Sequence, residues 1–154
     1  RGGLIYQPIV GLHANVAHHR PGLVLDGALV EGMGRKGLEL VVGARRDADW
    51  GPVVLVGLGG IWIEALKDVQ LLAPDLAEAD IVAALRRLKA APLFDGLRGE
   101  PPVDLGAVAR AVLAIGTQMR ANPAIAEVDI NPLLAYPDGV LALDALVVLQ
   151  RAPA

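Results

Sequence analysis

The stretch VDINPLLAYPDGVLALDALVVL, residues 128–149, contains two apolar runs on either side of a Pro-Asp-Gly turn. Two such runs joined by a turn predict the strands of a β-hairpin. Each run nevertheless carries polar side chains where a strand of the core would have none: Asp129 and Asn131 in the first, Asp144 in the second. A buried polar group lowers stability unless it is paired or faces a ligand. The stretch therefore predicts both a hairpin and a candidate site on it.

The register of this hairpin brings two of the polar residues together. If the turn is centred on residues 137–139, residues whose numbers add up to about 275 to 277 lie opposite one another, as Asn131 and Asp144 do. Opposed side chains start roughly 5 Å apart, and alternation places Asp129 on the same face as Asn131. An amide oxygen facing a carboxylate suits Mg²⁺, which completes its shell with waters and substrate phosphates. The alternative is a solvated sheet edge, or side chains that bond to each other and to nearby backbone.

Further strands are predicted upstream of the hairpin. They cover Leu23–Met33, Leu38–Ala44, Pro52–Val56 and Ile61–Leu66, with a turn at Gly34–Gly37 and a hairpin loop at Arg45–Gly51. Four short strands at this spacing predict an antiparallel sheet. Residues 1–10 are compatible with a strand, followed by a short helix over Leu12–Arg20 that ends at Pro21-Gly22.

Two helices are predicted between the strands and the final hairpin. Asp75 can cap the first, with Glu78 in capping-box register, and Pro92 and Gly96 end it. Its apolar stripe consists of Ile81, Leu85 and Leu88. The second begins at Asp104 and stops at Asn122-Pro123. Its apolar residues recur at spacings of three and four: Leu105, Val108, Val112, Ile115 and Met119. The chain is therefore predicted to be an α+β fold, a mostly antiparallel sheet with two main helices packed on one side.

Composition excludes several classes of function. The chain has 154 residues, of which 54% are hydrophobic and 3% aromatic, and its net charge is −3, which argues against nucleic acid or an anionic membrane as partner. It has no cysteine and no serine, which excludes disulfides, thiolate catalysis, Cys-ligated zinc and a serine nucleophile. The uncharged run over residues 50–63 is shorter than the roughly 20 residues of a membrane span. We expect a soluble, cytoplasmic protein, and the start at Arg1 suggests a longer parent.

A glycine loop is the second candidate site. GLGGIW, residues 57–62, follows an apolar run, and its backbone N–H groups could approach phosphate. Trp62 stands where the third glycine of a dinucleotide fingerprint would be, so a Rossmann site is excluded, and a phosphate-binding turn or a plain hairpin bend remains. Glu39 and Glu64 interrupt apolar strands and either face a ligand or simply point outward. The three histidines are expected on the solvated surface: His13, His18 and His19.

Five stretches together resemble one family: GALVEGM, GLELVVGARRD, GPVVLVGLGGIWIEALKDV, LFDGLRGEPPVD and EVDINPLLAYPDGVLALDALVVL. They are similar to the ATP-grasp portion of the NDP-forming (ADP-forming) acyl-CoA synthetases, the acetate–CoA ligase family related to the succinyl-CoA synthetase β subunit. The resemblance runs from about Asp26 to Leu149. It implies an ATP-grasp-like lobe, with a C-terminal subdomain over residues 23–150 and a remnant of the preceding lobe over residues 1–22.

The resemblance also implies roles for individual residues. Asn131 and Asp144 would ligate the Mg²⁺ that bridges nucleotide phosphates, and Glu39 would lie at the nucleotide. The strand around Val30, Glu31 and Met33 would offer backbone groups to adenine. The phosphate end would be lined by the glycine loop and the following glutamate, that is by Gly57, Gly59, Gly60 and Glu64. Relatives convert a carboxylic acid, CoA and ATP to acyl-CoA, ADP and phosphate through an acyl phosphate and a phosphohistidine.

The chain also departs from the family. The first ATP-grasp lobe, the CoA-binding region and the phosphohistidine are missing, so the resemblance implies an incomplete site completed by a CoA-binding domain or subunit, and weak nucleotide affinity for the isolated chain. VQLLAP, residues 69–74, is one residue shorter than in many relatives and lacks their arginine. Three roles remain open: part of a ligase, a regulatory nucleotide-binding module fused to another activity such as an acyltransferase, or a subunit-contact domain. A homo-oligomer is possible.

Overall fold

The computed structural model describes residues 3–60, 68–96 and 99–150. The chain divides into two compact units, Arg1–Met33 and Gly34–Ala154, whereas the sequence suggested a boundary after residue 22. The role of residues 1–22 as part of a preceding lobe stays a prediction. None of the helices in the described ranges is long and apolar enough to cross a membrane.

The first unit contains the helix α1, Gly3–His19, and an irregular segment after it. Two predictions are wrong here: residues 3–10 are helical rather than a strand, and Leu23–Met33 forms no strand. A helix satisfies its own backbone hydrogen bonds, whereas a strand needs a partner strand. Apolar side chains such as Val24 and Met33 are exposed, so the β-forming composition of this segment did not lead to pairing within the described chain.

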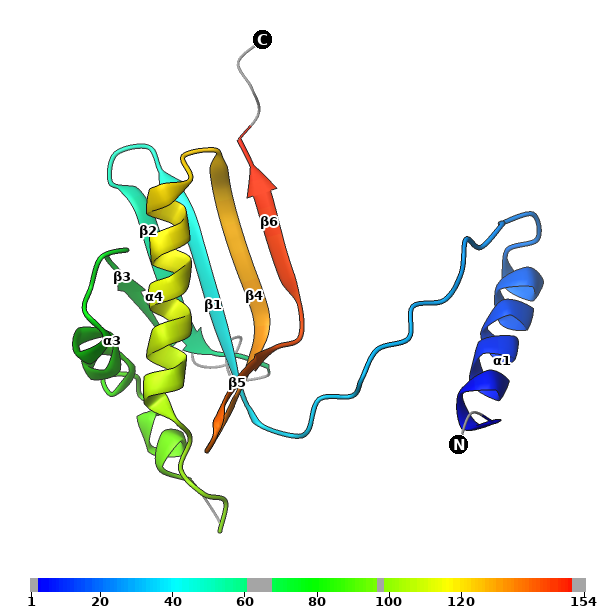
Figure 1. Ribbon diagram of the computed structural model, residues 1–154, viewed down its shortest axis with the longest axis horizontal. Coiled ribbons are helices and arrows are strands. Elements are labelled where there is room, and N and C mark those ends of the chain that lie inside the picture. The colour runs from blue at the N-terminus through cyan, green and yellow to red at the C-terminus, as the bar shows by residue number, and fades with distance from the viewer. Residues whose placement is uncertain (1–2, 61–67, 97–98, 151–154) are drawn as a thin grey trace. The chain divides into compact units, whose positions relative to one another are not determined.

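The second unit is built on a six-stranded antiparallel sheet (Figure 1). Its strands are β1 (Leu38–Asp47), β2 (Gly51–Leu58), β3 (Val69–Leu72), β4 (Ile125–Tyr136), β5 (Gly139–Ala142) and β6 (Ala145–Leu149). The order is β3-β2-β1-β4-β5, and β6 also pairs with β4, beyond the end of β5. The predicted strands at Leu38–Ala44 and Pro52–Val56 are confirmed, and both extend into the expected loop. The predicted strand Ile61–Leu66 lies outside the described residues, and β3 was not predicted.

The two main helices are α3 (Glu78–Leu85) and α4 (Leu105–Ala121), with a short 3-10 turn, η1 (Ala91–Asp95), between them. Asp104 caps α4 as predicted, because its side chain accepts a hydrogen bond of 2.9 Å from the Ala107 N–H. The cap predicted at Asp75 is wrong: α3 begins after Ala77 without a side-chain bond. The acidic residues of its first turn, Glu78 and Asp80, suit the positive end of the helix dipole instead.

The hydrophobic core lies between the helices and one face of the sheet (Figure 1). Both predicted helical stripes are buried in it, with Leu85, Val108 and Met119 fully enclosed. Burial of these two stripes is the main reason why the helices pack here, because short helices gain most of their stability from tertiary packing. The opposite face of the sheet carries neither α3 nor α4.

Candidate functional site

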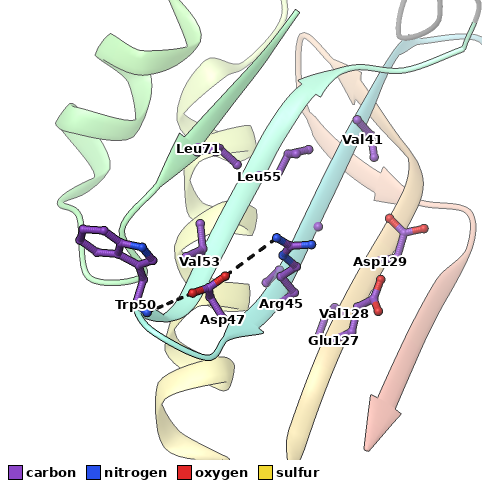
Figure 2. A pocket seen from close by; sticks show the side chains of 12 residues that line it. Val41, Arg45, Asp47, Trp50, Val53, Leu55, Leu71, Glu127, Val128 and Asp129 are labelled. Atoms are coloured by element: carbon purple, nitrogen blue, oxygen red, sulfur yellow. Dashed lines mark hydrogen bonds and ion pairs between the residues drawn. The ribbon is translucent and has the colours of Figure 1, made fainter. Parts of the chain in front are cut away.

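The face of the sheet opposite α3 and α4 holds a concave pocket of about 670 Å³ (Figure 2). Alternation along β1 turns Leu40 and Val42 toward the helices and Val41 and Arg45 toward this pocket. The lining combines apolar side chains with a few charged ones, as in small-molecule sites. It consists of Val41, Gly43, Ala44, Arg45, Asp47, Trp50, Val53, Leu55, Leu71, Glu127, Val128 and Asp129.

The charged groups of the pocket come from β1 and β4. Asp129 stands opposite Gly43, and its Oδ1 lies 3.8 Å from where a Cβ on Gly43 would be, so the glycine leaves space beside the carboxylate. Asp47 closes the β1–β2 turn by accepting hydrogen bonds from the Asp49 and Trp50 N–H groups, at 3.0 and 3.1 Å. These bonds, with a smaller contribution from Arg45, hold the pKa of the Asp47 carboxyl below its usual value.

The predicted register of the hairpin is confirmed on both sides of Asn131 and Asp144. The pairs Leu133–Ala142 and Ile130–Ala145 obey it, and the Leu143 N–H donates to the Pro132 carbonyl at 3.1 Å. Asn131 and Asp144 therefore occupy facing positions between these pairs, and both are exposed. Asp144 Oδ1 accepts a bond of 2.8 Å from the Ala145 N–H, which engages one of its two carboxylate oxygens.

A β-bulge surrounds Asn131. The register between β1 and β4 shifts between Leu40 and Val42, so that one residue of β1 stands against two of β4, Asn131 and Pro132, whose peptide bond is cis. A bulge reorients side chains relative to a regular strand. Ile130 and Leu133 are three residues apart, so regular alternation would place their side chains on opposite faces of the sheet. The bulge between them explains why both face the core.

The glycine loop and Glu39 lie together. The Gly59 N–H donates to the Glu39 carbonyl at 2.8 Å. Gly60 has φ of 60°, and a Cβ there would lie 2.5 Å from Glu39 Oε2, so any larger residue would displace the carboxylate. Gly57 is equally constrained, because its Cβ would lie 2.6 Å from the Asp68 carbonyl. The loop thus approaches the start of β1 closely, whereas the pocket extends along β1 from Val41 to Asp47.

The remaining predicted site residues lie in the first unit or outside the described residues, and their roles stay predictions. Val30, Glu31 and Met33 belong to the first unit and are exposed, and Glu64 lies outside the described residues. The three histidines are exposed on α1, as expected: His13, His18 and His19. Within the described ranges no group of three His, Cys, Asp or Glu side chains could hold a metal ion, so a metal site on the hairpin would depend on the amide of Asn131.

Sequence reasoning did not single out Arg45 as a site residue, although the spacing contained the signal. Glu39, Val41, Gly43 and Arg45 alternate along β1 and share the face opposite the core. If Glu39 faces a ligand, alternation places Arg45 on the same face and makes it a candidate site residue too.

Comparison with known proteins finds one consistent group. Residues 5–149 match the family model described as an ATP-grasp domain. The chain is 44% identical over 142 residues to a trans-feruloyl-CoA synthase from an unknown prokaryotic organism, covering 91% of this chain and 20% of that protein. It is 38% identical over 135 residues to the β subunit of the ADP-forming acetate–CoA ligase I of Pyrococcus furiosus, covering 88% of this chain and 58% of the subunit.

The fold is similar to that of a solved acetyl-coenzyme A synthetase from Ca. Korarchaeum cryptofilum, determined with coenzyme A and Ca-AMPCP. The TM-score is 0.82 at 35% identity, covering 94% of this chain and 63% of that one. A further structure of the same enzyme contains coenzyme A and Mg-AMPPCP, with a TM-score of 0.72 at 38% identity, covering 76% and 55%. The chain thus spans less than two thirds of each of these relatives.

Proposed function

The chain belongs to the ATP-grasp family, in the group of the ADP-forming acyl-CoA synthetases, and from that membership we propose that it forms the Mg²⁺- and nucleotide-binding part of such a ligase. The main support is the geometry of the last hairpin, where Asn131 and Asp144 occupy facing, exposed positions beside a bulge. The solved relatives with Ca-AMPCP and Mg-AMPPCP support the choice of ligand.

The donor set of the hairpin fits a hard cation. Asn131 offers an amide oxygen and Asp144 a carboxylate, and Asp129 adds a second carboxylate two residues before Asn131 on β4. Oxygen ligands of this kind suit Mg²⁺. When bound, the ion would offset the negative charge on the transferred phosphoryl group. Glu39 and the loop at Gly59 and Gly60 would position the nucleotide, because the backbone of this loop packs directly on β1.

For the whole protein we propose the conversion of a carboxylic acid, CoA and ATP to acyl-CoA, ADP and phosphate, with a CoA-binding domain or subunit as partner. The names of the relatives support this proposal: a trans-feruloyl-CoA synthase and an ADP-forming acetate–CoA ligase β subunit. Which acid is used would be decided by parts of the protein that contact the acid.

The metal assignment can be tested with Mn²⁺, which replaces Mg²⁺ at oxygen sites and broadens nearby NMR signals. In the presence of ATP, we expect broadening of the amide signals around Asn131 and Asp144, and its loss in Asn131→Ala and Asp144→Ala. In the full-length protein, either substitution should lower Mg²⁺-dependent phosphoryl transfer by about two orders of magnitude or more, as expected when charge stabilisation is removed.

Asp138→Ala is the matched control, because Asp138 is an acidic residue of the same hairpin that lies at its turn and pairs with Arg35. This variant should keep both the broadening and the activity. Wild-type behaviour of both site variants would refute the metal assignment.

A further inference from the structure

Two adjacent arginines on β1 have different environments. Arg46 faces the helices, where its guanidinium donates to the carbonyls of Met119, Asn122 and Ile125 and thereby ties β1 to the end of α4. Arg45 faces the other way, into the pocket (Figure 2). Because β1 is regular at this point, the alternation fixes these opposite directions.

Within the described residues, the ion pair recorded for Arg45 is a weak one. Its Nη2 lies 3.9 Å from Asp47 Oδ2, and 76% of its side chain is exposed. The Asp47 carboxylate already accepts two backbone hydrogen bonds, so it has hydrogen-bond donors without the guanidinium. An exposed pair at this distance contributes little stability, and Arg45 is able to turn toward a ligand at small cost.

Among the described residues that line the pocket, Arg45 is the one cation, and the other charged residues are Asp47, Glu127 and Asp129. Glu127 is its direct cross-strand neighbour, and Asp129 stands two positions further along β4, opposite Gly43. Two residues of a strand span roughly 7 Å, which is within reach of an extended arginine side chain. Asn131 of the proposed metal site lies two residues beyond Asp129 on β4. A triphosphate that extends from a metal ion held there toward Asp129 would bring a phosphate group close enough for Arg45 to contact it.

We propose that Arg45 binds the phosphate oxygens of the nucleotide on the pocket side of the metal site. This inference rests on the proposed function and adds a cation for the polyphosphate in a cavity whose other charged lining residues are carboxylates. A guanidinium contacts phosphate through two parallel N–H bonds.

The test is an NMR titration of the folded chain with Mg²⁺-tripolyphosphate and, separately, with Mg²⁺-ATP. We expect Arg45→Gln to weaken the binding of both at least tenfold, and Arg45→Lys to recover part of the affinity, because lysine keeps the charge but loses the two-bond geometry. Arg46→Gln is the matched control: it removes the same charge from the adjacent position, and should lower the melting temperature while leaving the dissociation constants within twofold, measured well below that temperature.

The possible outcomes separate this inference from the proposed function. If Mg²⁺-ATP shifts the signals around Asn131 and Asp144 equally in the wild type and in Arg45→Gln, the role of Arg45 is refuted and the nucleotide site stands. An equal loss of affinity in Arg46→Gln would mean that the effect comes from net charge alone, and would also refute the role of Arg45. If neither ligand shifts any signal of the wild-type chain at millimolar concentration, both proposals fail.

Discussion

At the scale of single residues, the pair Arg45-Arg46 shows that identical neighbours in a strand can have unrelated roles. Arg46 donates to the carbonyls of Met119 and Asn122 at the end of α4, where a helix leaves its last carbonyls without partners inside the helix, and to the carbonyl of Ile125 at the start of β4. Arg45 contacts the pocket on the other face. Substitution of Arg46 is therefore expected to change the stability of the protein, and substitution of Arg45 to change ligand binding.

Arg46→Ala should lower the free energy of unfolding by roughly 2 kcal/mol, because it leaves several carbonyls without a charged donor. Arg45→Ala should change it by less than about 0.5 kcal/mol, as is usual for an exposed side chain. Urea denaturation followed by circular dichroism measures both. Equal destabilisation by the two substitutions would contradict the assignment of Arg46 to the helix end.

At the scale of elements, α4 approaches the chain before α3 closely through a glycine. A Cβ on Gly116 would lie 2.5 Å from the carbonyl oxygen of Pro74, a backbone atom that cannot simply rotate away. The helix can pack at this distance only because the side chain is absent. Gly106, in the first turn of the same helix, faces the ends of three side chains instead: Glu78, Asp104 and Arg110.

Gly116→Ala should therefore destabilise the protein by about 1–3 kcal/mol, the usual range for an overpacked core, even though alanine is the better helix former. Gly106→Ala is the control within the same helix and should be neutral or stabilising by up to about 1 kcal/mol, because the nearest atoms, at 3.0 to 3.3 Å, are the ends of side chains rather than backbone. Thermal unfolding of both variants gives the comparison. A stabilising Gly116→Ala would show that α4 is less closely packed than described.

At the scale of the whole molecule, the hydrophobic core found among the described residues lies in the second unit. In the first unit, the apolar side chains of Val24, Leu29 and Met33 are exposed. We therefore expect the second unit to unfold cooperatively around its own core.

A chain reduced to residues 34–150 should fold and melt within a few degrees of the full chain, since the core is retained intact. Differential scanning calorimetry measures the melting temperature and enthalpy of both forms. A markedly lower melting temperature of the shorter form would mean that residues 1–33 contribute to the stability of the second unit.

The sequence by itself determined the features that depend on neighbours along the chain. The stripe from Leu105 to Met119 defined α4, Asp104 its start, and the turn at residues 137–139 the register that gives Asn131 and Asp144 facing positions in the hairpin. The resemblance in five stretches identified the family without coordinates. These signals could be read because helical periodicity, caps and tight turns are set by a few consecutive residues.

Only the tertiary structure decided which extended segments pair and which side chains meet. Leu23–Met33 has the composition of a strand but forms none in the described part of the chain, whereas the short β3 pairs with β2. The bulge at Asn131, the contact of Gly60 with Glu39 and the pocket that joins Arg45 to Asp129 all link residues far apart in sequence. A strand is stabilised by its neighbours in the sheet rather than by its own residues, so neither its pairing nor the cavity on its face is encoded locally.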